Sequence, residues 1–444
     1  MKRREFIKIG GAAALATAVA PRLTAQKTEE PEQMLIRENP MNGDRISAIG
    51  FGCMRWPMIK DAKGKDVIDQ DAVNEMVDYA IAHGINYFDT SPAYLQGQSE
   101  KAAGIALSRH PRESYYIATK LSNFGDQSKE ASIQMYKDSF KQLKTDYFDY
   151  YLLHSIGRGG AKAFAHRYTE NGMLEFLNKE KAAGRIRNLG FSFHGAQDEF
   201  DWFMQLHDSG EQVWDFVQIE MNYVDWRHAD GRRNTNAEYL YQELDKRGIP
   251  IVVMEPLLGG RLANVPEGIA RQMKTREPDM SPASWAFRFC ATYPRVLCIL
   301  SGMTNMEPLK ENVQTFGHFK PLTDEEIAFM ERMAVEMKEY PLVNCTDCKY
   351  CMPCPWGLDI PGTFQHYNKS ITEGTYAQSR DQKDYRKLKR AYLVSYDRAV
   401  ATLRQADRCI SCGECLSHCP QSINIPRELR RIARYVEDLK QDKL

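Results

Sequence analysis

Eight cysteines in two short runs are the residues with the clearest chemistry. Three thiolates at positions i, i+3 and i+6 can clasp three irons of a cubane on one loop. Neighbours three residues apart also suit a shared metal better than disulfide bonds with one another. The spacing therefore predicts iron–sulfur chemistry near the C-terminus. The first run is Cys345, Cys348, Cys351 and Cys354 before Pro355, and the second is Cys409, Cys412, Cys415 and Cys419 before Pro420.

These two runs resemble the arrangement of two-cluster ferredoxins, in a helical variant with a long insertion. Closed tetrahedral zinc sites are the alternative, but they usually need two CxxC pairs, and each run here has a third cysteine and a Cys-Pro. The bound clusters could carry electrons or could act as structural staples. The resemblance implies one [4Fe-4S] cluster on Cys345, Cys348, Cys351 and Cys419, and a second on Cys409, Cys412, Cys415 and Cys354.

Four polar residues follow consecutive apolar segments, at the points where strands are expected to end. Asp89 and Tyr94 lie in "DTSPAYLQGQSE", Lys120 ends "ATK" and His154 lies in "LLHS". A tyrosine, with a pKa near 10, is a weak acid–base catalyst at neutral pH, and a cation beside it favours the phenolate and lowers that pKa. Each residue alone has a plain structural explanation in packing, solvation or turn formation. Their order at neighbouring strand ends favours a catalytic set.

The order and context of these residues resemble the aldo-keto reductase family over roughly residues 44–320. The resemblance implies that Tyr94 donates a proton to the carbonyl oxygen and that Lys120 is its neighbour. Asp89 would then be the partner of Lys120, and His154 would orient the carbonyl. It also implies hydride transfer between NAD(P)(H) and a carbonyl or alcohol substrate.

Contacts to the nicotinamide cofactor are implied by the same resemblance. Gln218 matches the glutamine that holds the carboxamide, and Ser192 matches the serine of a Ser-Asn pair whose asparagine is here Phe193. Met254 stands where many members have a tyrosine stacked on the nicotinamide. The loop "EPLLGGRL" resembles the loop over the pyrophosphate, and the pair at 311–312 resembles the adenine contact. The expected contacts are Gly52, Met54, Arg55, Ser192, Gln218, Met254, Pro256, Leu257, Gly259, Gly302, Thr304, Glu311 and Asn312.

The preference between NAD and NADP stays open. Gly302, Met303 and Pro308 occupy positions where NADPH-preferring members of the family often carry lysine, serine and arginine. A 2′-phosphate would lack its usual cationic partners there.

Short apolar segments alternate with amphipathic ones from about residue 45 onward. Eight strand-then-helix units predict a closed (β/α)₈ TIM barrel of the α/β class. An open doubly wound sheet is the rival, weakened by the unit count and by the absence of a GxGxxG after a strand. Gly84, Gly184 and Gly248 stand where helices are expected to stop. The expected strands cover 46–54, 86–91, 115–120, 148–154, 188–193, 216–222, 250–256 and 296–302.

The alternation ends after Asn312, and a small domain is expected to follow the barrel. The segment "LTDEEIAFMERMAVEMKEY" reads as a helix with Thr323 as N-cap and Glu326 three residues on. We predict a barrel over 44–320, a linker helix over 321–344 and a mainly helical two-cluster ferredoxin-like domain over 345–444.

The N-terminus carries the features of an export signal. A charged start precedes about a dozen small apolar residues, with a plausible cut after Ala25. Arg3 and Arg4 resemble the twin-arginine signal, which implies transport of a folded protein to the periplasm. We therefore expect a signal peptide over 1–25 and an N-terminal segment over 26–43. No other apolar run reaches 18 residues, so no integral membrane segment is expected in the mature protein.

The overall charge narrows the class of partner, and the three remaining cysteines are not expected to take part in binding. Lysine plus arginine and aspartate plus glutamate both total 59, so no global field favours nucleic acid. We expect a small-molecule substrate and a redox partner protein. The basic runs at 386–390 and 427–434 are expected to be solvated helix faces. Cys53, Cys290 and Cys298 lie in apolar contexts and are expected to be buried.

Three functional hypotheses follow. The first is a carbonyl reductase or alcohol dehydrogenase of the aldo-keto reductase type, with two [4Fe-4S] clusters for electron transfer. The second is an exported electron-transfer or redox-sensing protein whose barrel binds a dinucleotide without turnover. The third is a reductase whose clusters are purely structural. Nicotinamide gives up two electrons as hydride whereas each cluster takes one, so a flavin or a partner protein would be the natural converter, and no flavin motif is recognisable.

Overall fold

The computed structural model describes residues 33–229 and 234–444. The predicted signal peptide over 1–25 and the first residues of the 26–43 segment lie outside this range. Among the described residues, no helix is long and apolar enough to cross a membrane.

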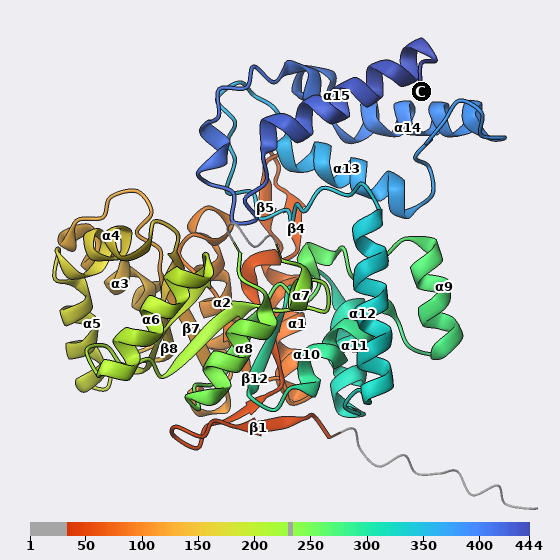
Figure 1. The fold of residues 1–444 in the computed structure, drawn as a ribbon. Coiled ribbons are helices and arrows are strands. Elements are labelled where there is room, and N and C mark those ends of the chain that lie inside the picture. Colours follow the sequence, from red (N-terminus) through yellow and green to blue (C-terminus); the bar gives the residue numbers. More distant parts are fainter. Residues whose placement is uncertain (1–32, 230–233) are drawn as a thin grey trace, which may run out of the picture. The chain divides into compact units, whose positions relative to one another are not determined.

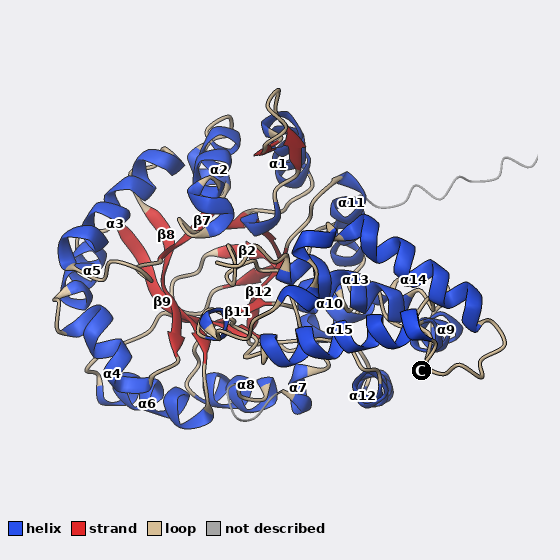
Figure 2. Cartoon of the chain, turned by 90° about the horizontal axis from the view of Figure 1, so that it is seen from above, coloured by secondary structure: helices blue, strands red, loops and turns tan. Residues whose placement is uncertain are grey.

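Eight parallel strands close into a barrel, in the hydrogen-bonded order β10-β11-β12-β3-β6-β7-β8-β9 (Figure 2). This confirms the predicted (β/α)₈ fold. Parallel strands are buried on both faces, which explains why each one is a nearly continuous apolar run. The strands are β3 (Ile49–Gly52), β6 (Tyr87–Asp89), β7 (Tyr116–Leu121), β8 (Phe148–Gly157), β9 (Ile186–His194), β10 (Phe216–Glu220), β11 (Ile251–Met254) and β12 (Val296–Ser301).

Helices surround the strands, and their apolar faces pack against the outside of the barrel (Figure 2). Gly84, Gly184 and Gly248 follow α1, α5 and α8 with φ angles of 87°, 76° and 72°, as expected for glycines that stop helices. The helices are α1 (Gln70–Ala82), α2 (Ser99–Leu107), α3 (Lys129–Leu143), α4 (Gly160–Phe164), α5 (Met173–Ala182), α6 (Gln197–Ser209), α7 (Asp225–His228), α8 (Ala237–Lys246), α9 (Glu267–Arg276), α10 (Pro282–Thr292) and α11 (Met306–Gly317).

Two small hairpins precede the first barrel helix. One pairs β1 (Ile36–Glu38) with β2 (Arg45–Ser47), and the other pairs β4 (Met58–Lys60) with β5 (Asp66–Ile68). Ile46 of the first hairpin packs against the inward-facing residues Tyr87, Tyr150 and Phe216, so this hairpin covers one end of the barrel interior. The functional groups must therefore lie at the opposite end.

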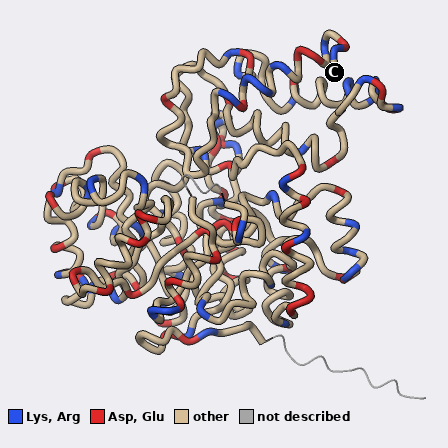
Figure 3. Tube along the Cα trace, in the orientation of Figure 1, with Lys and Arg blue, Asp and Glu red and all other residues tan. Residues whose placement is uncertain are grey.

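After the barrel, α12 (Asp324–Glu339) leads to the cysteine runs. Its Thr323 and Glu326 form the predicted capping box. The three helices α13 (Ile360–Thr372), α14 (Tyr385–Ala399) and α15 (Ile425–Gln441) follow (Figure 1). They bury a second core rich in tyrosine, which contains Tyr367, Tyr392 and Tyr435. Charged residues of both signs are spread over barrel and helices alike (Figure 3).

Candidate active site and cysteine sets

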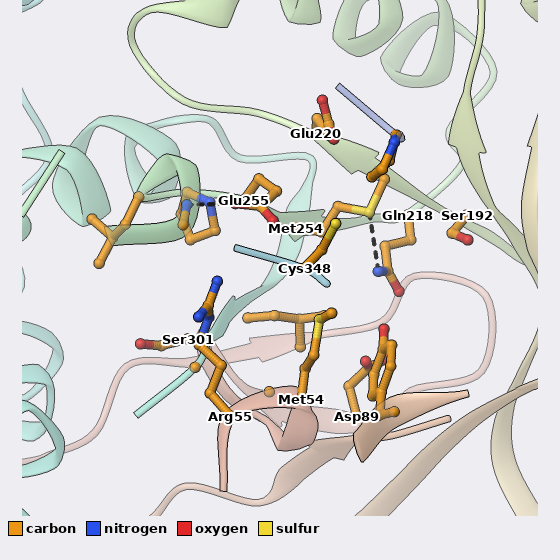
Figure 4. Close-up of a pocket in the computed structure, with 18 of the residues that line it drawn as sticks. Met54, Arg55, Asp89, Ser192, Gln218, Glu220, Met254, Glu255, Ser301 and Cys348 are labelled. Carbon is orange, nitrogen blue, oxygen red and sulfur yellow. Dashed lines mark hydrogen bonds between the residues drawn. The ribbon is translucent and has the colours of Figure 1, made fainter. Parts of the chain in front are cut away.

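A cavity of about 340 Å³ lies at the carboxyl ends of the barrel strands. Most of the site residues expected from the sequence line it, although they come from strands far apart in the chain (Figure 4). The carboxyl end of a parallel barrel is where loops bring such groups together. The expected residues that line this active-site cavity are Gly52, Met54, Arg55, Asp89, Tyr94, His154, Ser192, Gln218, Met254, Pro256, Leu257, Gly259, Gly302 and Thr304.

Tyr94, Lys120 and Asp89 form one connected group. The Lys120 ammonium donates to Asp89 Oδ1 over 2.5 Å and to the Thr90 carbonyl over 2.9 Å. Its Nζ lies 5.1 Å from the centre of the Tyr94 ring. The Lys120 side chain is fully buried behind the cavity. A buried cation that is paired with a carboxylate is thus held beside the tyrosine.

The ionisation of Tyr94 differs from the sequence-based expectation. Burial, with Asp89 as the next cause, raises the pKa of Tyr94 well above its ordinary value. Burial also lowers the pKa of Lys120, and Asp89 opposes that change. Desolvation disfavours the phenolate more than the nearby ammonium favours it. Tyr94 is therefore a neutral phenol in this structure, the form that can donate a proton.

His154 faces the same cavity in its neutral form. Burial, then the positive charge of Lys120, lowers the pKa of His154 well below its ordinary value. The Ser122 hydroxyl lies 2.5 Å from His154 Nδ1. When that hydroxyl donates to Nδ1, the ring proton is on Nε2, which can donate to a substrate oxygen.

Two expected cofactor contacts, and one expected catalytic residue, do not line the cavity. Lys120 is fully buried, pairs with Asp89 and lies beside the Tyr94 ring. Asn312 is buried and donates to the Ser301 hydroxyl over 3.0 Å. Glu311, its neighbour on α11, also lies outside the cavity lining. The roles of Glu311 and Asn312 stay predictions.

The cavity is also lined by two carboxyl groups, those of Glu220 and Glu255 (Figure 4). The sequence reasoning did not single out these two residues. Glu220 Oε1 lies 3.3 Å from His194 Nδ1. Glu255 accepts the Gly259 N–H over 2.6 Å, and burial, with Glu220 as the next cause, raises its pKa to about 7. Both residues follow apolar strand segments, and that position was the signal that could have identified them.

Both cysteine runs contribute to the wall of the cavity. Cys348 and Tyr350 come from the first run, whereas Pro420 and Gln421 follow the last cysteine of the second. Sequence reasoning did not predict this contribution, because nothing in the spacing of the cysteines relates them to the barrel strands.

The eight cysteines gather in two sets of four around two separate hollows. Cys345, Cys348, Cys351 and Cys419 line one hollow, and we call them the inner set. Cys354, Cys409, Cys412 and Cys415 line the other and form the outer set. These are the sets that the ferredoxin resemblance implies. Within the part of the chain that the structure describes, no three His, Cys, Asp or Glu side chains converge as they would on a single ion. Four cysteine thiols around one hollow are the donor set of a [4Fe-4S] cubane.

Barrel residues hold the inner set in place at both ends. Arg55 donates to the Thr346 carbonyl and lies 3.6 Å from Asp347. Arg158 donates to the carbonyls of Cys419 and Pro420. The Gln421 amide donates to Glu220 over 2.7 Å.

Two protein-family models match this chain, one over the barrel and one over the cysteine runs. Residues 48–334 match the model of the "Aldo/keto reductase family". The chain belongs to the aldo/keto reductase family. Residues 344–424 match the model described as "4Fe-4S dicluster domain". The protein is thus an NAD(P)-dependent oxidoreductase of the aldo-keto reductase type that carries a ferredoxin-like domain.

Three curated relatives each match about two thirds of this chain. The uncharacterized oxidoreductase YqkF of Bacillus subtilis is 26% identical, over 64% of this chain and 92% of its own length. The L-galactose dehydrogenase of Arabidopsis thaliana is 25% identical over 68% and 94%. The NADH-specific methylglyoxal reductase of Escherichia coli is 25% identical over 67% and 98%.

Solved structures of aldo-keto reductases share the barrel fold. The reductase AKR11C1 from Bacillus halodurans, in its holo form, has a TM-score of 0.53 at 23% identity, over 68% of this chain and 96% of its own. A reductase from Klebsiella pneumoniae in complex with NADPH has a TM-score of 0.52 at 21% identity, over 68% and 96%.

Members of the family use NAD(P)H, and the described residues fit its nicotinamide end. Gln218 Oε1 is buried without a hydrogen-bond partner, whereas its Nε2 contacts Met254 Sδ at 3.4 Å (Figure 4). A free acceptor at this place suits the carboxamide NH₂ of a nicotinamide. The Ser192 hydroxyl already accepts the Ser155 N–H over 2.8 Å but still lines the cavity.

Proposed function

We propose that the protein catalyses reversible hydride transfer between a nicotinamide cofactor and a carbonyl or alcohol substrate. The observation that carries the proposal is the convergence of Tyr94 and His154 on one cavity, with the buried Lys120–Asp89 pair behind the tyrosine. When bound, the nicotinamide supplies or accepts the hydride.

The chain's own residues would supply proton transfer and orientation. Tyr94 donates its phenolic proton to the carbonyl oxygen during reduction and takes it back during oxidation. His154 donates a hydrogen bond to the same oxygen and so fixes its position. Asp89 holds Lys120, whose charge stabilises the phenolate that remains after proton donation. Gln218 would hold the carboxamide through its unpartnered Oε1.

Substitution of Tyr94 tests this proposal. Tyr94→Phe removes the proton donor, and we expect kcat to fall by about 10²- to 10⁴-fold, the usual contribution of a general acid. The visible absorbance of the clusters should be unchanged. Tyr151→Phe is the matched control, because that buried hydroxyl has no partner and lies away from the cavity. Retention of turnover in Tyr94→Phe would contradict the assignment.

We also propose that the C-terminal domain binds two [4Fe-4S] clusters, one on each cysteine set. The inner set lies beside the active-site cavity, and the outer set includes the exposed Cys412. Bound there, the clusters supply one-electron carriers. Iron and sulfide analysis of the anaerobically purified protein should give two cubanes per chain. Cys348→Ser and Cys412→Ser should each remove one of two distinct cluster signals, and loss of both or of neither signal would contradict separate sets.

The outer set supports the proposal of a redox partner protein. Trp356 and Ile410, which line the same hollow as the outer cysteines, are more than half exposed at 57% and 56%. Exposed apolar side chains around a redox centre suit a transient protein contact. Trp356→Ala should slow electron exchange with an electron-transfer protein but not with a small dye, as measured by stopped-flow absorbance.

Export by the twin-arginine route to the periplasm is a further proposal. It is supported by the sequence "MKRREFIK" and by a cofactor-bearing domain that would be assembled before transport. Replacement of Arg3 and Arg4 by lysine should retain the protein in the cytoplasm, as checked by cell fractionation. Continued export of that variant would exclude this route.

A further inference from the structure

Tyr350 brings the inner cysteine run into the active site. It stands between Cys348 and Cys351, two members of the inner set, and it lines the same cavity as Tyr94 and His154. The active site is therefore completed by a loop that belongs to the cluster domain and not to the barrel.

An aromatic chain connects Tyr350 with His154. The ring centres of Tyr350 and Phe124 are 6.4 Å apart, and those of Phe124 and His154 are 5.0 Å apart. The Arg167 guanidinium lies over the Phe124 ring at 5.3 Å and donates to the His154 carbonyl over 2.9 Å. Any displacement of Tyr350 would thus reach the group that orients the substrate oxygen through one intervening ring.

The backbone around Cys348 leaves Tyr350 little freedom to move independently. Asp347 and Lys349, on either side of Cys348, have φ angles of 54° and 64°, in the left-handed region that non-glycine residues seldom adopt. Packing with the barrel is close as well. A Cβ added to Gly259 would lie only 2.4 Å from Thr346 Cα. The loop is held between the inner cysteines and the barrel rim, so its position depends on both.

We infer that Tyr350 determines substrate specificity in the active-site cavity. Tyr350 also couples ligand binding in that cavity to the cluster on the inner cysteine set. Ligand binding is not coupled to the cluster on the outer set. This inference rests on the proposed hydride chemistry, because that chemistry defines which ligands enter the cavity. It adds a residue from outside the barrel to the substrate site.

Coupling between two sites is reciprocal. If a ligand in the cavity changes the reduction potential of the inner cluster, reduction of that cluster must change the ligand's dissociation constant by the same free energy. For a one-electron couple, a tenfold change in dissociation constant corresponds to a shift of about 59 mV. The two quantities can be measured independently, and they must agree.

Specificity is tested first with two aldehydes of different size, methylglyoxal and para-nitrobenzaldehyde. Tyr350→Ala, or Tyr350→Leu where the alanine variant loses iron, should change the ratio of their kcat/KM values by about tenfold or more, mainly through KM. Leu403→Ala is the control, since Leu403 is an exposed side chain of the C-terminal domain that lines neither the active-site cavity nor either cysteine hollow. An unchanged ratio in the Tyr350 variants would overturn the specificity role.

Coupling is tested without turnover, using the redox-inert tetrahydro analogues of NADH and NADPH. Binding of an analogue should alter the electron paramagnetic resonance signal and the potential of the inner cluster, identified by its loss in Cys348→Ser, and leave the outer cluster unchanged. Tyr350→Ala should reduce this shift. Saturable binding that leaves both clusters unchanged would overturn the coupling alone. If neither analogue binds, the proposed nicotinamide chemistry is contradicted, and this inference with it.

Discussion

Cys348 and Tyr94 line the same cavity, although one belongs to a cysteine run after the barrel and the other to a loop near its beginning. Tyr94, the proposed proton donor, and one member of the inner cysteine set therefore share one space. This relationship explains why barrel residues such as Arg55 and Arg158 are engaged with the backbone of the cysteine runs. It also brings residues of the C-terminal domain into the lining of the active-site cavity.

The Lys120–Asp89 pair should be essential for both activity and stability, for separable reasons. Lys120→Met leaves the buried Asp89 carboxylate unpaired, and breaking a buried pair costs about 3–5 kcal/mol of folding free energy. We expect a lower apparent Tm and a loss of turnover. The double variant Lys120→Met with Asp89→Leu should recover most of the Tm but none of the turnover. Recovery of turnover in that double variant would show that the pair is only structural.

Arg158 and Arg430 should protect different cysteine sets. Arg158 anchors the carbonyls of Cys419 and Pro420, next to the inner set, whereas Arg430 donates to the Ser411 hydroxyl over 2.9 Å, between two outer cysteines. Arg158→Ala should hasten loss of the inner cluster under air, and Arg430→Ala should hasten loss of the outer one. Time-resolved iron release and resonance spectra distinguish the two. Equal sensitivity of both clusters in both variants would contradict the separate anchoring.

Neighbouring glycines in the loop after β11 should respond differently to alanine. Gly259 and Gly260 both have positive φ angles, 67° and 95°, so each substitution strains the backbone by about 1–2 kcal/mol. Only at Gly259 would the new methyl group meet Thr346, whereas no atom lies within 4 Å of a Cβ at Gly260. Gly259→Ala should therefore also weaken retention of the inner cluster and lower kcat/KM. Indistinguishable variants would show that this contact does not position the cysteine run.

Glu100 should make stability fall as the pH rises. Burial raises its pKa from 4.5 to about 7, against hydrogen bonds that include one from the Thr119 hydroxyl over 2.6 Å. Between these pH values the folded chain keeps a proton that the unfolded chain has lost. The contribution of Glu100 to the free energy of unfolding is therefore complete below its pKa in the unfolded chain. This contribution decreases by up to about 3 kcal/mol as the pH rises through about 7.

Glu100→Gln should remove this pH dependence. The difference in apparent Tm between pH 5 and pH 8 would then be smaller in the variant than in the unchanged protein. Glu130→Gln, a substitution of an exposed glutamate in the first turn of α3, is the control and should keep the full dependence. An unchanged pH profile in Glu100→Gln would mean that Glu100 is ionised in the folded protein at pH 5.

Local sequence patterns predicted the fold well because each barrel element is specified by its own residues. Apolar runs identified all eight barrel strands, and Thr323 with Glu326 identified the start of α12. The grouping of the cysteines into two exchanged sets also followed from spacing and resemblance. Each of these signals lies within one segment or in a repeated motif.

Features that depend on contacts between distant segments were not predictable in this way. Tyr350 enters the cavity because the cysteine loop packs on the barrel rim. The spacing of the cysteines in the sequence does not predict this packing. The pKa of Tyr94 was expected to fall beside Lys120, but the sequence does not show how deeply the tyrosine is buried, and burial prevails. Glu220 and Glu255 were overlooked because carboxylates at strand ends are common, and only the closed barrel brings these two together.

The most direct measurement of the central claim is the distance between a bound ligand and the inner cluster. Electron–nuclear double resonance on the reduced protein, with the tetrahydro analogue of NADH or NADPH deuterated on its nicotinamide ring, reports deuterons near each cluster. If Cys348 and Tyr94 share the active-site cavity, the inner cluster should show deuterium coupling that disappears in Cys348→Ser, and the outer cluster should show none. Bound analogue with no deuterium coupling to the inner cluster would contradict the account.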